Sequence, residues 1–299
     1  MYAGSSAVLA QGRVSAASVP TASPLPTGDA ARERLAELLR GGNVVVLSGA
    51  GLSTESGIPD YRGPDGKRRV TPMTYLDFVR SAENRQRYWA RSFAGWRRFA
   101  SATPNDGHRA VTALQQRGLL RCIITQNVDG LHQRAGARDV IELHGSLARV
   151  VCLQCGQSSA REELDARLRE ANPDFSATAH ELRPDGDVVL SDEAVRSFRV
   201  VHCLACGSDL LKPDVIFFGE SVPKPVVMRC FSEVEQSTAL VVLGSSLQVM
   251  SGYRFVLRAA ELGRPVAIVT HGSTRGDAEA TIRIDAPLGT TLQALVAEL

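Results

Sequence analysis

Short apolar runs alternate with helical patterns along most of this 299-residue chain, and this alternation limits the fold more than any other feature. The apolar runs lie at 43–51, 121–127, 139–143, 214–219, 239–246 and 264–270, with a weaker one at 281–285. Helical patterns lie at 29–40, 105–118, 225–237, 253–263 and 290–299. Fully apolar runs that alternate with helices predict an α/β fold, in which a parallel sheet is covered on both faces.

Two stretches break this rhythm, at 64–104 and 151–207. We interpret them as insertions that together form a smaller domain. The large domain then consists of 29–63, 105–150 and 208–299. Residues 1–28 are rich in Ala, Ser and Pro and lack the pattern of a secretory signal, so we expect a disordered extension.

The second stretch carries two Cys-x-x-Cys pairs, which predict a zinc site. A glycine follows each pair, as in turns that bring two thiolates onto one ion. Four thiolates leave no open coordination position, so the ion is expected to be structural, and His202 is not needed as a ligand. The predicted ligands are Cys152, Cys155, Cys203 and Cys206.

Charge and hydropathy exclude several classes of partner. No run of 18 apolar residues is present, and the formal net charge is only +2. The sequence therefore favours neither a membrane nor a nucleic acid as partner. We expect a monomeric protein of the cytoplasm, and a mitochondrial location is the less favoured alternative.

A glycine turn follows the first apolar run, in the sequence SGAGLSTESGIPDYRG. A glycine turn directly after a strand is where α/β folds bind the phosphates of a nucleotide. The spacing differs from the dehydrogenase fingerprint, because Thr54 stands where the third glycine is required and Gly57 comes late. Charged and aromatic side chains follow at Asp60, Tyr61 and Arg62.

Polar residues also end two later runs. Gln126, Asn127 and Asp129 follow one of them, and Gly244, Ser245 and Ser246 end the other. Binding residues collect at such carboxyl ends of parallel strands. Capping of the next helix explains each group alone, but three strands that end in this way together favour a binding site.

His144 lies eight residues before the first Cys-x-x-Cys pair and has three possible roles, as metal ligand, catalytic base or core residue. Four cysteines already complete the metal site. Packing in the core is disfavoured because LHGS ends a strand beside the other polar strand ends. We therefore predict a general base, a role that a neutral imidazole suits near pH 7.

The chain resembles the sirtuin family of NAD-dependent protein deacylases from about Ala30 to its C-terminus. The similar motifs are GAGLSTESGIPDYRG, TQNVDGLHQRAG, ELHGS, the two Cys-x-x-Cys pairs, KPDVIFFGE and GSSLQVMSGYRF. Tyr61 and the segments RQRYWARSFAGW and RPDGDVVLS make it most similar to the class II branch, which includes a mitochondrial lipoamidase and ADP-ribosyltransferase.

This resemblance implies a Rossmann-type NAD-binding domain, a small zinc domain and an acyl-lysine protein or peptide bound between them. NAD is then a reactant that loses nicotinamide, and ADP-ribose receives the acyl group. His144 would take a proton from a ribose hydroxyl, with Asn127 and Asp129 as further catalytic residues. The implied cofactor contacts are Gly49, Ala50, Gly51, Ser53, Asp60, Tyr61, Arg62, Gln126, Asn127, Asp129, Gly244, Ser245, Ser246, Thr270, His271, Gly272 and Leu288.

The substrate peptide is expected to add as a strand, with contacts at Val215, Phe218, Gly219, Glu220 and Val249. Tyr88 and Arg91 are three residues apart and would share one face of a helix. We hypothesise that they meet the far end of a long or acidic acyl group, such as glutaryl or lipoyl. The alternative is that Tyr88 packs in a core and Arg91 is solvated.

Two other functions remain open at this point. A protein ADP-ribosyltransferase would use the same NAD site without deacylation, and a zinc protein that senses NAD would have no catalysis. The complete set of polar residues expected for the chemistry argues against the second.

Overall fold

The computed structural model describes residues 28–62, 67–68, 71–176 and 183–299. The predicted N-terminal extension, but for residue 28, lies outside the described residues. The main sheet has the strand order β3-β2-β1-β7-β8-β9, and every neighbouring pair in it is parallel. The parallel sheet predicted from the apolar runs is therefore confirmed. Its strands are β1 (Val44–Ser48), β2 (Leu120–Thr125), β3 (Val140–Glu142), β7 (Ala239–Leu243), β8 (Val266–Val269) and β9 (Ile282–Ile284).

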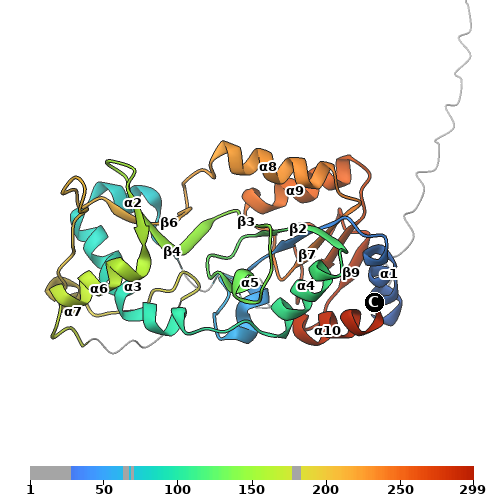
Figure 1. Ribbon diagram of the computed structural model, residues 1–299, viewed down its shortest axis with the longest axis horizontal. Coiled ribbons are helices and arrows are strands. Elements are labelled where there is room, and N and C mark those ends of the chain that lie inside the picture. Colours follow the sequence, from blue (N-terminus) through green and yellow to red (C-terminus); the bar gives the residue numbers. More distant parts are fainter. Residues whose placement is uncertain (1–27, 63–66, 69–70, 177–182) are drawn as a thin grey trace, which may run out of the picture.

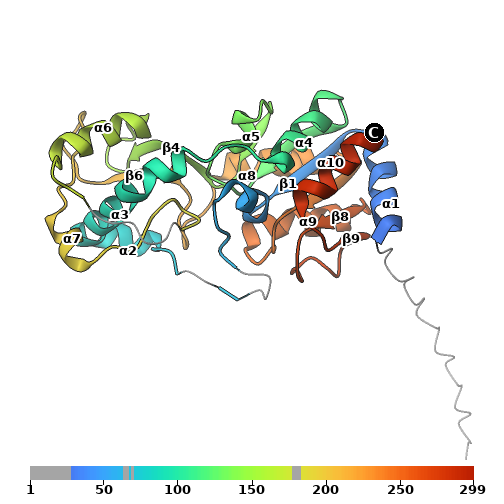
Figure 2. The same ribbon diagram turned by 90° about the horizontal axis from the view of Figure 1, so that it is seen from below.

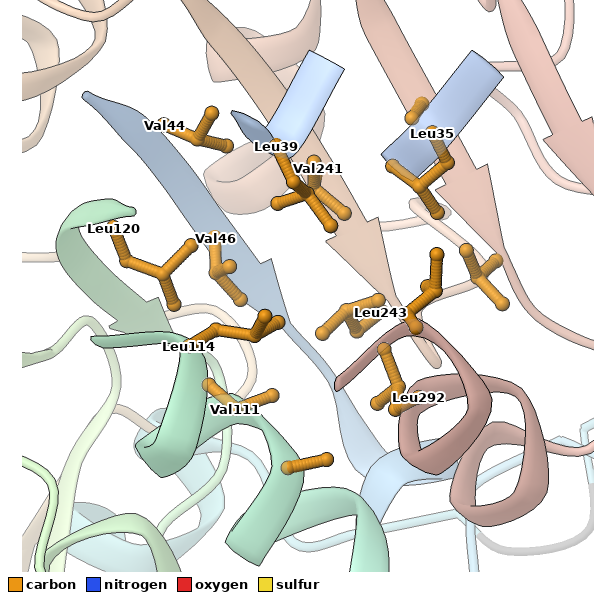
Figure 3. Close-up of a cluster of buried hydrophobic side chains, with 14 of the residues drawn as sticks. Leu35, Leu39, Val44, Val46, Val111, Leu114, Leu120, Val241, Leu243 and Leu292 are labelled. Atoms are coloured by element: carbon orange, nitrogen blue, oxygen red, sulfur yellow. The ribbon is translucent and has the colours of Figure 1, made fainter. Parts of the chain in front are cut away.

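Helices cover both faces of this sheet, which explains why its strands are apolar at almost every position. Val44 and Val46 of β1 point into one core, which is drawn in Figure 3, and Val45 and Leu47 point into the other. The first core is closed by α1 (Gly28–Arg40), α4 (Asp106–Gln116) and α10 (Leu288–Glu298). The second is closed by α8 (Lys224–Glu235) and α9 (Met250–Glu261), on the opposite side of the sheet in Figure 1.

A smaller lobe lies at the end of the molecule away from α1 (Figures 1 and 2). Its three-stranded sheet has the order β5-β4-β6, with β4 (Gly145–Cys152), β5 (Ser158–Ala160) and β6 (Leu211–Val215). The helices around it are α2 (Tyr75–Arg80), α3 (Ala82–Ala100), α6 (Arg161–Ala171) and α7 (Asp192–Ser197). Phe78 and Trp89 share a core there with Leu164 and Phe198, so both interrupting stretches contribute to it. The domain boundaries themselves stay a prediction.

One apolar run does not lie where the alternation placed it. The run at 214–219 was expected among the parallel strands, but β6, which holds its start, pairs antiparallel with β4 in the smaller lobe. An apolar run identifies a strand without identifying its partner. Here the chain leaves the second cysteine pair beside β4, and Leu211 pairs with Cys152.

The chain reverses its winding direction at β1. One half of the sheet runs outward from β1 through β2 to β3, and the other runs from β7 through β8 to β9. Such a switch point leaves a crevice at the carboxyl ends of the strands. The 3₁₀ helix η1 (Ala50–Ser56) follows β1 there, and the short helix α5 (Leu131–Arg134) follows β2.

Two turns approach each other closely in this crevice. Gly51 N donates to Gly244 O over 2.8 Å, and a Cβ at Gly49 would lie 2.8 Å from the same oxygen. The glycine at 49 is therefore required by the contact between the two turns, whatever ligand they hold. Among the described residues, no helix is both long and apolar enough to cross a membrane.

Candidate active site and metal centre

The four predicted zinc ligands lie together, with their sulfur atoms all within 4.8 Å of one another. The Sγ atoms of Cys152 and Cys206 are 3.7 Å apart, as are those of Cys155 and Cys203. A tetrahedron with zinc–sulfur bonds of about 2.3 Å has edges of about 3.8 Å, so the sites of the four thiolates fit one zinc ion.

The backbone around each cysteine pair has the same conformation. Gly156 N donates to Cys152 O over 2.9 Å, and Gly207 N donates to Cys203 O over the same distance. Both glycines have positive φ angles, of 75° and 73°, which glycine adopts without strain. The glycine after each pair thus closes the turn that holds two thiolates on one side.

A cavity of about 520 Å³ opens at the switch point and extends to the smaller lobe. It collects all but three of the predicted cofactor, substrate and catalytic residues. The exceptions are Arg91, Gly272 and Leu288. The predicted residues that line it are Gly49, Ala50, Gly51, Ser53, Asp60, Tyr61, Arg62, Tyr88, Gln126, Asn127, Asp129, His144, Val215, Phe218, Gly219, Glu220, Gly244, Ser245, Ser246, Val249, Thr270 and His271.

His144 lies between β3 and β4, and its hydrogen bonds fix its tautomer. Nδ1 is 3.0 Å from Gln126 O, and because a carbonyl oxygen only accepts, Nδ1 carries the proton. Nε2 is then unprotonated and accepts from Ser251 Oγ over 2.8 Å. Burial lowers the pKa of His144 to about 4, so this ring stays neutral near pH 7.

Ser53 joins the two polar side chains that follow β2. Its hydroxyl donates to Asp129 Oδ2 over 2.7 Å and accepts from Asn127 Nδ2 over 3.0 Å. Asn127 Nδ2 also donates to Gly49 O over 3.1 Å. Burial raises the pKa of Asp129, while the hydrogen bonds from Leu131 N and Ser53 act against that rise. These bonds hold both side chains at the bottom of the cavity.

The Asp285 carboxylate holds the two residues at 271–272, which follow β8, by hydrogen bonds. Asp285 accepts from His271 Nδ1 over 3.0 Å and from Gly272 N over 3.3 Å. The hydrogen bond from His271 lowers the pKa of Asp285. Thr270 and His271 line the cavity, whereas Leu288, the first residue of α10, is buried in the core of the large sheet.

The proposed acyl pair is divided by the structure. Tyr88 and Arg91 both belong to α3, but only Tyr88 lines the cavity. Arg91 Nη2 is 3.0 Å from Asp187 Oδ2, and its Nε donates to Val188 O over 2.7 Å. The Arg91 side chain is 17% exposed, so it is neither solvated nor directed at the cavity as a free cation.

A buried ion pair shapes the loop at 217–220. Lys212 Nζ is 3.1 Å from Glu220 Oε2, and the same oxygen accepts from Phe217 N over 2.9 Å. The ammonium group also lies 4.8 Å from the centre of the Phe217 ring. Glu220, which was expected to contact substrate, lines the cavity, and its carboxylate has one partner on β6 and one within the loop.

Several residues of the site were not identified from the sequence. Ser251, Lys212 and Asp285 hold predicted site residues in place, and Asp185 lines the cavity directly. Asp185 belongs to the segment RPDGDVVLS, which contributed only to the family resemblance. No spacing of residues in that segment indicated that Asp185 lines the cavity. A charged residue within an apolar strand, as at Lys212, is the one local signal that pointed to a buried partner.

Comparison with known proteins agrees with this geometry. The model of the Sir2 family matches residues 49–251. The NAD-dependent protein deacetylase 1 of Streptomyces coelicolor is 58% identical over 269 residues, which cover 90% of each chain. The human mitochondrial NAD-dependent protein lipoamidase sirtuin-4 is 46% identical over 282 residues, which cover 92% of this chain and 88% of the relative.

A solved structure also superposes on the chain. The complex described as Sir2-p53 peptide-NAD+ has a TM-score of 0.72 and 29% sequence identity. The match covers 89% of this chain and 97% of that one. The Rossmann-type sheet with a smaller zinc-binding lobe, expected from the resemblance, is therefore confirmed.

Proposed function

The chain belongs to the Sir2 family and is an NAD-dependent protein deacylase, and we propose that His144 is its catalytic base. The observation that supports this role is the tautomer of His144. Its unprotonated Nε2 faces Ser251, and both residues line the cavity. Relatives with the words deacetylase and lipoamidase in their names make acyl-lysine proteins the substrate class.

In the proposed reaction, the acyl group moves from lysine nitrogen to the ADP-ribose part of NAD, nicotinamide leaves and one water is consumed. Bound NAD supplies the ribose that receives the acyl group. His144 Nε2 takes the proton from a ribose hydroxyl and exchanges its present contact with Ser251 for that hydroxyl. Gln126 O keeps the ring oriented during this exchange, because it holds Nδ1–H.

The remaining site residues are assigned by their places in the cavity. We propose that the turns at Gly49–Gly51 and Gly244–Ser246 hold the phosphates, since glycine leaves their backbone accessible. Asn127 and Asp129, fixed by Ser53, are proposed to bind nicotinamide and its ribose. Thr270 and His271 are proposed to bind the adenosine. The peptide would add as a strand between the loop at 217–220 and Val249.

We propose an acyl group longer than acetyl, because the cavity continues from His144 to Tyr88 in the smaller lobe. A preference for acidic acyl groups would require Arg91 to bind the acyl carboxylate. The ion pair between Arg91 and Asp187 disfavours this, because the guanidinium group already has an anionic partner. Turnover of acetyl, glutaryl and lipoyl peptides by the wild type and by Arg91→Ala separates the two forms. An unchanged preference in Arg91→Ala excludes a direct role for Arg91.

The catalytic role is tested with His144→Ala. Loss of a positioned general base typically costs about 10²–10⁴-fold in rate. We expect deacylation to fall by this factor, while exchange of labelled nicotinamide into NAD continues, because the proton transfer follows nicotinamide departure. Equal thermal stability of wild type and variant is the control. Deacylation that stays within about threefold of wild type would exclude His144 as the base.

The partners are proposed on the same basis. A net charge of +2 offers no general attraction to nucleic acid, and we propose acyl-lysine proteins as the macromolecular partners and a monomeric enzyme in the cytoplasm. Light scattering at assay concentration tests the monomer.

A further inference from the structure

Two polar atoms in the wall of the cavity lack a hydrogen bond of normal geometry among the described residues. Tyr88 and Asp185 both line the cavity on the side of the smaller lobe. The Tyr88 hydroxyl and Asp185 Oδ1 are buried and make no hydrogen bond of normal geometry within the described part of the chain, although the Tyr88 hydroxyl lies near Ser92. A buried polar atom without a partner costs free energy, so a ligand that supplies one is favoured.

The nearby cations are already engaged by another acid. Backbone N–H groups of Asp185 and Asp187 act against the rise that burial causes in the pKa of Asp185, and the Asp187 carboxyl group lies beside this side chain. Arg91 and Arg183 are directed at Asp187 instead, at 3.0 Å and 3.6 Å, and neither lines the cavity. The wall therefore presents a phenol and a carboxylate to the acyl group, with the guanidinium groups behind them.

This arrangement discriminates between acyl end groups by simple chemistry. A primary amide donates to Asp185 and also exchanges a hydrogen bond with Tyr88. A carboxylate cannot donate and adds a negative charge beside a buried one. An alkyl end leaves both atoms unsatisfied. Arg68 also lines the cavity, and its guanidinium lies 4.7 Å from the centre of the Phe218 ring.

We propose that Tyr88 and Asp185 form a terminal subsite that favours acyl groups ending in a hydrogen-bond donor, a primary amide or an undissociated carboxylic acid. The subsite disfavours carboxylate and alkyl ends. This inference deepens the proposed deacylase function and rests on it. The preferred substrate is then an acyl group with a neutral polar end, in place of the acidic acyl group expected from Arg91.

Three acyl groups of equal size test the proposal on one lysine peptide. They are glutaryl, its primary amide 5-amino-5-oxopentanoyl, and the hydrocarbon 5-methylhexanoyl. We measure kcat/KM with NAD at pH 8, and peptide Kd by calorimetry without NAD. Burial and the Asp185 carboxyl raise the pKa of Asp187 to about 7, so at pH 8 this acid is ionised. For the amide peptide, kcat/KM is expected to be about tenfold or more higher, and Kd about tenfold or more lower, than for either of the other two peptides.

Two variants identify the atoms responsible. Tyr88→Phe removes the phenol oxygen. The kcat/KM of the amide peptide divided by that of the 5-methylhexanoyl peptide should then fall toward one. Asp185→Asn places an amide donor on the wall, so binding of the glutaryl peptide should improve and the ratio of amide to carboxylate should fall about tenfold. Asp174→Asn changes an exposed acid of the same lobe and is the matched control, with wild-type ratios expected.

The readouts separate this inference from the function beneath it. The same Kd for all three peptides, or a preference for glutaryl in the wild type, overturns the subsite. The expected Kd order without any turnover would support the subsite and contradict the deacylase function. At pH 6 the amide and glutaryl values should approach each other, because Asp187, which faces Arg91, Arg183 and Tyr88, then carries a proton and the wall loses a negative charge.

Discussion

At the scale of single residues, the cavity depends on hydrogen bonds that set protonation states. A carbonyl oxygen at one nitrogen of His144 determines which nitrogen is free to accept a proton. Ser53 has the same function for the pair that follows β2, since one hydroxyl serves both Asp129 and Asn127. Ser53 was named from the sequence as a cofactor contact, whereas Ser251 shows its importance only through its contact with His144.

The lowered pKa of His144 predicts an unusual pH profile. Burial keeps the ring neutral down to about pH 4, and the neutral form is the active base. The value of kcat/KM for an acetyl-lysine peptide, whose short acyl group does not extend to Tyr88 and Asp185, should therefore stay level from pH 8 to pH 5 at constant ionic strength. An ordinary histidine would lose half of its base form near its unperturbed pKa of about 6.5. A midpoint there would contradict the assigned environment.

At the scale of elements, β6 and the loop after it position the substrate side of the cavity. The ion pair between Lys212 and Glu220 is largely buried and turns the chain back beneath Phe217. Lys212→Met leaves the Glu220 carboxylate without its cation, and we expect the free energy of unfolding to fall by about 2–3 kcal/mol.

The double variant Lys212→Met/Glu220→Gln is the matched control for that change. It removes both charges and should recover more than half of the loss, as measured by urea denaturation. KM for the peptide should rise in the single variant more than kcat falls, because the loop borders the peptide site. Equal losses in single and double variants would show that the pair itself is not the cause.

The zinc centre joins the end of β4 to the segment that precedes β6 in the smaller lobe. Cys152→Ser should lower the bound zinc from one ion per chain and lower the melting temperature of this lobe first, since a structural zinc site contributes folding free energy. Zinc content by atomic absorption and near-ultraviolet circular dichroism check this. Cys230→Ser changes a cysteine outside the centre and should keep the full zinc content.

At the scale of the whole molecule, three buried histidines link stability to pH. Burial lowers the pKa of His108 and His144 to about 4 and of His132 to about 3. Below pH 6.5 the unfolded chain binds protons that the folded chain does not. The stability from these groups is complete above pH 6.5 and is lost as the pH falls toward 4.

We therefore expect the urea midpoint to fall between pH 7 and pH 5. His132→Gln removes one of these groups and should weaken this dependence. A midpoint that is the same at pH 7 and pH 5 would contradict the buried, neutral state of these rings.

The sequence predicted the fold and most of the cavity because both follow from local patterns. Apolar runs and glycine turns placed the switch point, and cysteine spacing placed the metal. What it missed depends on partners distant in the chain. The antiparallel pairing of β6 and the ion pair between Arg91 and Asp187 each depend on residues that no sequence spacing brings together.

The central claim is that the cavity around His144 transfers the acyl group of a lysine to ADP-ribose. Mass spectrometry of the products from NAD and one acyl-lysine peptide tests it most directly. The account predicts free nicotinamide, O-acyl-ADP-ribose and deacylated peptide in equal amounts from the wild type, with the last two nearly absent from His144→Ala. ADP-ribosylated protein or peptide with the acyl group still on lysine would contradict it.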